Sequence, residues 1–170
     1  MSTYICKTCG EEHEGPPLSY GAEAPAAYYG VPEEEREKRC HLSSDQCIID
    51  NEFFFILGNI YLPIIDKEET FNWMAWVSLS EANFDRASEL WETPGREEEP
   101  AYFGWLSTEL PCYPSSTLSL KTNVHTQEIG VRPVIELQDS DHPLEKEQKE
   151  GITWERVEEI SSLILHNENS

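Results

Sequence analysis

Residues 46–79 carry four strand-like segments in close succession, and this run most limits the folds open to the chain. Segments 47–49, 53–57, 59–65 and 71–79 are rich in β-branched and aromatic residues, which favour strands. Residues 50–52 suit a hairpin turn, and residues 66–70 a loop. Short connections of this kind join antiparallel neighbours, whereas parallel strands need a long crossover. The run therefore predicts an antiparallel sheet.

The rest of the chain adds helices and further strands around this sheet. Ser80 suits a helix cap before 81–92, and Thr153 suits one before 154–166. The other predicted helices are 31–39 and 144–150, and the other predicted strands are 102–106, 118–126 and 132–137. Strands that follow one another, with helices grouped outside them, indicate an α+β fold with a mainly antiparallel sheet and a few flanking helices.

The length of 170 residues is sufficient for one domain and short for two. We expect a single domain over 1–170. Within it, residues 1–50 would form a small Cys-bearing N-terminal segment, resembling a zinc knuckle, with a helix. That segment would pack on an α+β body formed by residues 51–170.

The charge of the chain is strongly negative, with 12 Lys and Arg against 33 Asp and Glu and a formal net charge of −21. Such a chain repels nucleic-acid phosphates and anionic membrane surfaces, so neither is expected as a partner. A basic protein would instead be attracted to it. No apolar stretch is long enough to span a membrane, and no signal peptide is visible at the start, so we expect a cytoplasmic protein.

Cys6 and Cys9 form the most specific local motif, in the stretch Cys-Lys-Thr-Cys-Gly. Two intervening residues let both thiolates reach one zinc ion, and a structural zinc needs four ligands. Our first choice is the set Cys6, Cys9, His13 and Cys47. Cys40 in place of His13 is the main variant, and His142 is a more distant candidate. The alternatives are a redox pair and inert thiols.

A second group of polar residues lies near the predicted strands 118–126 and 132–137. Lys121, Asn123, His125 and Arg132 could share one sheet face, where the cations could receive an anionic ligand. Asp45 or His142 could join this group. This arrangement would allow an enzyme pocket with His125 as the base. The simpler interpretation is that these cations pair with the excess carboxylates, and we favour it. No catalytic residue is predicted.

Several blocks, in order along the chain, resemble an uncharacterised, mainly bacterial family catalogued as domain of unknown function 2199. The blocks are the Cys6–Cys9 motif with His13 and the segments 43–50, 76–81, 102–106, 118–125, 132–133 and 141–153. The family pattern includes Cys6, Cys9, His13 and Cys47 more firmly than Cys40, and has Gly more often than Cys at position 112. The resemblance implies a shared fold unit and a metal site, and it implies no reaction.

These observations favour a soluble, acidic protein-binding module with a structural zinc ion. One concrete form is an immunity or antitoxin-like protein that masks a cationic nuclease, because small acidic proteins suit that role electrostatically. An enzyme with a pocket around Lys121, His125 and Arg132 is the alternative, and a redox or metal-sensing role for the cysteines is the third hypothesis.

Overall fold

The computed structural model describes residues 3–5, 12–14 and 17–167, and the side chains of residues 17–164. The ten strands are β1 (Thr3–Ile5), β2 (Glu12–Glu14), β3 (Ser19–Gly21), β4 (Cys40–Leu42), β5 (Gln46–Ile49), β6 (Phe53–Pro63), β7 (Thr70–Leu79), β8 (Tyr102–Leu106), β9 (Lys121–His125) and β10 (Val134–Leu137) in the described part of the chain. The helices are α1 (Ala26–Tyr29), η1 (Glu33–Glu35), α2 (Arg36–Arg39), α3 (Glu81–Glu89), η2 (Arg96–Glu98), α4 (Pro143–Glu150) and α5 (Trp154–Asn167).

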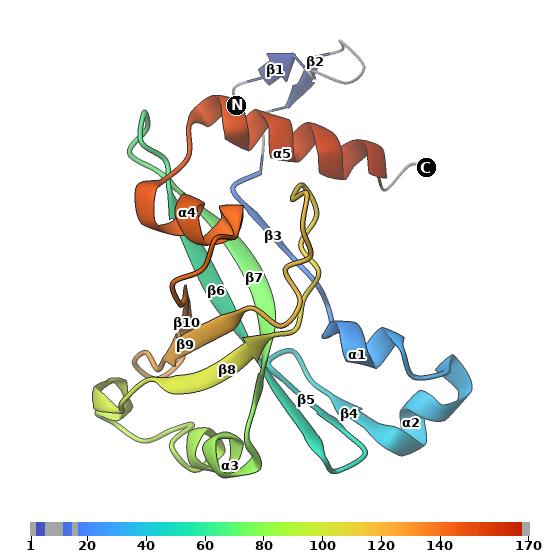
Figure 1. Ribbon diagram of the computed structural model, residues 1–170. Coiled ribbons are helices and arrows are strands. Elements are labelled where there is room, and N and C mark those ends of the chain that lie inside the picture. Colours follow the sequence, from blue (N-terminus) through green and yellow to red (C-terminus); the bar gives the residue numbers. More distant parts are fainter. Residues whose placement is uncertain (1–2, 6–11, 15–16, 168–170) are drawn as a thin grey trace.

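Strands β6 to β10 close into a barrel-like ring (Figure 1). β6 and β7 form a long antiparallel hairpin, and β7, β8, β9 and β10 continue in antiparallel order. The ring closes where β10 runs parallel to β6, with Val134 opposite Asn59. β3 joins β7 in parallel, while β5 and β4 extend antiparallel from β6. The α+β class is therefore consistent with the structure, although the sheet is mixed.

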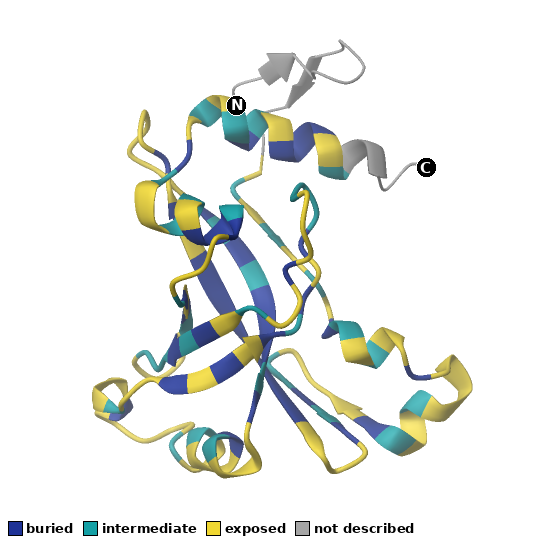
Figure 2. Ribbon diagram, in the orientation of Figure 1, coloured by how far each residue is buried: buried dark blue, intermediate teal, exposed yellow. Residues whose placement is uncertain are grey.

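Alternation along β6 and β7 divides the apolar side chains between two cores. Because successive residues of a strand point to opposite faces, Phe54 enters the core inside the ring and Phe55 enters a second cluster outside it. Trp73 and Trp76 divide in the same way, and both are fully buried. Figure 2 shows the buried residues along these two strands. The long hairpin thus supports both cores.

The helices cover the two ends of the ring, with α4 and α5 at one end and α3 at the other (Figure 1). α4 and α5 pack on the ring core through the buried side chains of Leu144, Val157 and Ile160. On α3, the ring of Phe84 packs against that of Phe54 at a centroid distance of 5.2 Å. These contacts leave the polar faces of the helices to solvent.

The helix ends follow the capping residues in the sequence. The Ser80 hydroxyl accepts a hydrogen bond from the amide of Asn83, and the Thr153 hydroxyl accepts one from Arg156. Both predicted caps are confirmed. His142 caps α4, because its Nδ1 accepts from the amide of Leu144 at 3.0 Å. Gly151 ends α4 with a φ of 85°, a conformation that a side chain would strain.

Several element boundaries differ from the sequence predictions for local reasons. The predicted strand 118–126 begins only at Lys121, because Ser119 adopts a φ of 67° in a turn. The strand predicted from Arg132 begins at Val134, after Pro133, which has no amide hydrogen to donate. Segments 53–57 and 59–65 are one continuous strand, β6, and the helix predicted over 31–39 begins as the 3₁₀ turn η1.

The N-terminal segment is described only in part. β1 and β2 pair antiparallel, with Ile5 opposite Glu12 and Tyr4 opposite His13. Cys6 and Cys9 lie outside the described residues, and so does the side chain of His13. The zinc-knuckle part of the predicted fold and the single-domain division therefore stay predictions. Among the described helices, none is long and apolar enough to cross a membrane.

Candidate functional site

A large cavity lies where β6 meets β10, beside α3. Its volume is about 550 Å³. One wall comes from α3 and the segment after it, which contribute Leu90, Trp91 and Arg96. The opposite wall comes from the connection between β9 and β10, which contributes Arg132. We call this cavity the α3 pocket. Its lining joins a mainly apolar surface to a few polar groups, as ligand pockets commonly do.

Arg96 is a buried cation of the α3 pocket, with only 8% of its surface exposed. Its Nη1 donates to the carbonyl of Trp91 at 3.1 Å. Its Nη2 donates to the carbonyls of Glu128 and Val131, at 2.8 and 3.1 Å. Nε is buried and has no partner. No carboxylate pairs with this guanidinium among the described side chains. The guanidinium also lies over the ring of Trp91, 5.7 Å from its centroid. Arg96 therefore joins both pocket walls, and its charge is met by carbonyl dipoles and an aromatic ring instead of a carboxylate.

Arg132 is the second cation of the pocket and is only partly neutralised. Its Nε donates to Oδ1 of Asp45 at 2.7 Å, and its Nη1 contacts the sulfur of Met74 at 3.7 Å. A thioether is a weak acceptor. No partner is found for Nη2 in the described part of the chain. The outer edge of the guanidinium is therefore available to a ligand.

Asn59 and Tyr102 complete the polar lining of the α3 pocket. Asn59 is 8% exposed, and its Oδ1 accepts from Nδ2 of Asn72 at 2.9 Å. The Tyr102 hydroxyl donates to Glu99, which also pairs with Arg86. Burial, followed by the hydrogen bond to Glu99, raises the pKa of Tyr102 above its usual range. The hydrogen bond from Arg86 lowers the pKa of Glu99. Tyr102 thus stays neutral near the cavity.

The other face of α3 is acidic. Glu81, Asp85 and Glu89 recur every four residues, so they lie on one side of the helix, and all three are exposed. Glu92, Glu97 and Glu98 continue this surface after the helix, and they are also exposed. No ion pair involves any of these six residues within the described chain. We call them the α3 acidic surface.

The structure does not bring Lys121 and His125 together with Arg132 in one pocket. His125 lies at the end of β9, on the outer sheet surface, with its Nε2 3.1 Å from Glu136. This contact lowers the pKa of Glu136. Lys121 lies over the ring of Trp105, 6.0 Å from its centroid. Of the three, only Arg132 lines the α3 pocket. His125 and Arg132 pair with carboxylates, as the simpler interpretation expected.

The two central cysteines lie in the second core. Cys40 on β4 and Cys47 on β5 are buried with Val31, Phe55 and Trp76. Burial raises the pKa of both thiols, that of Cys47 to about 12, and the charge of Cys40 adds to the shift at Cys47. Figure 1 draws β2, which carries His13, at the opposite end of the molecule from β5.

His142 and Cys112 are not placed near these cysteines. His142 caps α4, and its Nε2 lies 3.1 Å from the carbonyl of Ser115. Within the described residues, no three His, Cys, Asp or Glu side chains are grouped to hold a metal ion. The ligand set Cys6, Cys9, His13 and Cys47 stays a prediction, because Cys6 and Cys9 lie outside the described chain.

Comparison with known families identifies the chain over most of its length. Residues 5–152 match the family described as an uncharacterized protein conserved in bacteria, domain of unknown function 2199. The chain belongs to this family. The family description names no activity and no ligand, so the predicted resemblance is confirmed without adding a reaction. No curated protein and no solved structure matches this family member.

Sequence reasoning missed the main residues of the α3 pocket. It named Arg132 and Asp45 in connection with a pocket, but it assigned no role to residues 93–100. One signal was present in the sequence: Arg96 is the single cation between Glu92 and Glu99, and it follows Gly95. Its burial depends on carbonyls 32 and 35 residues further along the chain, at Glu128 and Val131.

Proposed function

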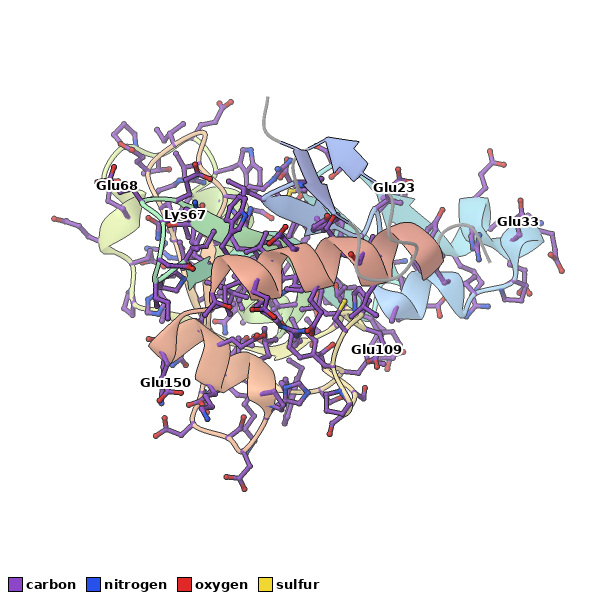
Figure 3. The ribbon with its side chains drawn as sticks, turned by 90° about the horizontal axis from the view of Figure 1, so that it is seen from above. Glu23, Glu33, Lys67, Glu68, Glu109 and Glu150 are labelled. Carbon is purple, nitrogen blue, oxygen red and sulfur yellow. The ribbon has the colours of Figure 1, made fainter. Side chains whose placement is uncertain are left out.

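We propose that this protein is a binding module that recognises a basic protein partner through its acidic surface. An immunity-like protein that masks a cationic enzyme is one concrete form of this proposal. Exposed glutamates lie around the whole molecule, as the labelled Glu23, Glu33, Glu68, Glu109 and Glu150 illustrate in Figure 3. A surface of this charge steers a basic protein toward it over distances comparable with the Debye length.

The cations of the chain do little to neutralise its outer surface. Six of the described Lys and Arg side chains pair with carboxylates: Arg39, Arg86, Arg132, Lys146, Lys149 and Arg156. Four others lie over aromatic rings: Arg36, Lys67, Arg96 and Lys121. With 33 acidic residues in the chain, most carboxylates have no cation to pair with. The excess negative charge therefore remains at the surface.

The α3 acidic surface is the observation that carries this proposal. Like charges four residues apart on a helix cost about 0.2–0.5 kcal/mol per pair, so Glu81, Asp85 and Glu89 lower the stability of α3. A local arrangement that opposes stability is expected where a protein performs its function. The neighbouring Trp91 is 41% exposed and adds an aromatic side chain of the kind enriched in interfaces.

Affinity capture followed by binding measurements with the purified partner tests the proposal. We expect a basic protein that is captured at about 50 mM salt and lost at about 500 mM, because screening weakens steered association. The variant Glu81→Gln/Asp85→Asn/Glu89→Gln should bind this partner about tenfold more weakly. The matched control Glu33→Gln/Glu34→Gln/Glu37→Gln removes the same charge elsewhere and should bind within about twofold of the wild type.

Two outcomes would contradict this function. One is the recovery of no basic protein at either salt concentration. The other is an equal loss of affinity in both triple variants, which would mean that net charge, and not the α3 acidic surface, sets the binding. The enzyme alternative has lost its sequence support, because Lys121 and His125 do not line the pocket that contains Arg132.

We also propose a structural zinc ion bound by Cys6, Cys9 and His13, with Cys47 as the fourth ligand to be tested. The pairing of β1 with β2 supports the first part, since it places Tyr4 opposite His13 and places Ile5, the residue before Cys6, opposite Glu12. Thiolate and imidazole are the ligands that structural zinc prefers. Zinc would tie down an N-terminal segment that has little apolar material.

Elemental analysis of untagged protein tests the zinc site. We expect about one zinc per chain in the wild type, and a loss of zinc in Cys6→Ser and His13→Ala. Cys112→Ser is the matched cysteine control and should keep the metal. Cys47→Ser decides the fourth ligand: retained zinc would exclude Cys47 and direct attention to Cys40. Wild-type protein without zinc, purified under reducing conditions, would refute the proposed site.

A further inference from the structure

We propose that the α3 pocket binds a small monocarboxylate that carries an apolar body, with its carboxylate on the free edge of Arg132. This inference is independent of the protein-binding function. The cavity of about 550 Å³ lies within the usual range of ligand sites, about 300–1,000 Å³. Ile56, Leu90 and Trp91 offer the apolar walls, and the polar groups are few. Such a lining orients one charged group and shelters the remainder of the ligand.

The charge balance of the lining favours an anion. Two guanidinium groups, of Arg96 and Arg132, line the α3 pocket, whereas Asp45 is its only carboxylate among the described residues. Asp45 is already paired with Arg132. The charge of Arg96 is met by the carbonyls of Trp91, Glu128 and Val131 and by the ring of Trp91, and by no carboxylate among the described side chains. A buried cation without an opposite charge is costly, so an anion in the cavity would stabilise it.

Arg132 is the residue that would contact the ligand carboxylate directly. Its Nε is used by Asp45, but Nη1 meets only the weak acceptor sulfur of Met74, and Nη2 has no partner in the described chain. The Nη1–Nη2 edge of a guanidinium matches the two oxygens of a carboxylate, which it binds with two parallel hydrogen bonds. A ligand carboxylate would replace the contact with Met74 by this stronger pair. Arg96, whose Nε is buried, would act through its charge and by holding the walls together.

The surroundings select a singly charged ligand. Asp45 cancels one of the two cations, so the lining carries a single excess positive charge. Beyond the cavity, the α3 acidic surface and the net charge of −21 repel polyanions such as nucleotides. Asn59 and Thr126 add neutral hydrogen-bonding groups. One carboxylate on an apolar or aromatic body therefore fits this pocket better than a phosphate ester does.

The probe pair 4-phenylbutanoate and 4-phenylbutanamide tests the inference, because the two differ in charge and hardly in shape. Titration calorimetry and NMR shift mapping on the whole protein would measure binding. We expect the wild type to bind the acid about tenfold or more tightly than the amide, as a charge-assisted pair predicts. Arg132→Gln should bring the two affinities within about twofold. Arg39→Gln, which breaks the similar exposed pair with Asp50, should preserve the difference.

Asp45→Asn gives a second test, in which the inference predicts tighter binding and not a loss of binding. It removes the competing carboxylate, so the acid should bind a few-fold more tightly than to the wild type, while the amide should be unchanged. Equal binding of acid and amide to the wild type would overturn the inference. So would the absence of acid binding at millimolar concentration, or a charge preference that survives Arg132→Gln in a folded protein.

Discussion

Arg96 is buried and Arg156 is partly buried, and the partners of these two arginines differ. Arg156 on α5 donates to Glu147 at 2.8 Å, to Glu159, and to the carbonyl of Cys112 at 3.1 Å. Its guanidinium also lies over the ring of Tyr113. Arg96 donates to backbone carbonyls and lies over the ring of Trp91, but no carboxylate among the described side chains pairs with it, and its Nε has no partner. A buried cation whose charge is matched by the protein serves the fold, whereas one left unmatched beside a cavity is a candidate for binding.

The surroundings of Arg156 form a closed network. Glu147 accepts from Arg156 with one oxygen and from the Tyr113 hydroxyl with the other, at 2.7 Å. Tyr113 in turn accepts from Nε1 of Trp73 at 3.0 Å. These bonds tie α4 and α5 to the ring core through the connection between β8 and β9. Each of the three guanidinium nitrogens of Arg156 therefore has a partner within the described chain.

Glu147→Leu should lower the free energy of unfolding most, because it removes the carboxylate that pairs with Nε of Arg156. Removal of one partner of a fully buried ion pair costs about 3–5 kcal/mol. Because Arg156 and Glu147 are partly exposed, we expect a loss at the low end of this range in the free energy of unfolding. Urea unfolding followed by tryptophan fluorescence would measure it. Glu159→Gln removes the more exposed partner of Arg156, so it should cost less than about 1 kcal/mol. Equal losses in the two variants would show that the network is not tightly coupled.

Arg96→Met should cost less, about 2 kcal/mol, because the three carbonyls that lose their donor lie beside a cavity that water can enter. The variant separates the two pocket walls, so we also expect faster hydrogen exchange in residues 126–133. Arg86→Met is the matched control, since it removes an exposed arginine from α3. Unchanged exchange in Arg96→Met would contradict the role of Arg96 in joining the walls.

The same pair of arginines shows how far the sequence could predict this molecule. Arg156 lies at a helical position three residues from Glu159, and the helix and its Thr153 cap could be predicted locally. The strands could be predicted from their alternation, which places Phe54 and Phe55 in different cores. These features depend on residues close together in the chain, where periodicity is informative.

The α3 pocket could not be predicted in the same way. Arg96 meets Glu128 and Val131 across more than thirty residues, and Arg132 meets Asp45 across 87. Pairing of β10 with β6 closes the ring and brings these segments together. The alternation of apolar and polar residues along the strands does not indicate this parallel pairing. The predicted group of Lys121, His125 and Arg132 failed for a related reason. Residues close in sequence were separated when the chain turned from β9 into the connecting loop.

The Arg156 network should also set the stability at alkaline pH. Burial, followed by the charge of Glu147, raises the pKa of Tyr113 far above the value of about 10 in an unfolded chain. The unfolded state therefore loses this proton first, so stability present below pH 10 falls as the pH rises above it, by about 1.4 kcal/mol per pH unit. Urea unfolding between pH 9 and 11 should show a shallower decline in Tyr113→Phe, and an unchanged slope would contradict the assignment.

Gln127→Glu should have the smallest effect on stability of the variants considered. It tests most directly whether the positive charge of the α3 pocket, in contrast to that around Arg156, serves binding. Gln127 lines the α3 pocket, so a carboxylate there would add a second negative charge to that of Asp45 and match the two arginines, as Glu147 and Glu159 match Arg156. The exchange conserves shape and loses one hydrogen bond to the carbonyl of His125, so we expect a change of only about 0.5 kcal/mol. If unmatched positive charge makes this pocket a binding site, 4-phenylbutanoate should bind at least about fivefold more weakly, while its amide should bind as before. Undiminished acid binding would mean that the charge of the lining does not select the ligand, and the contrast between the two arginines would then concern the fold alone.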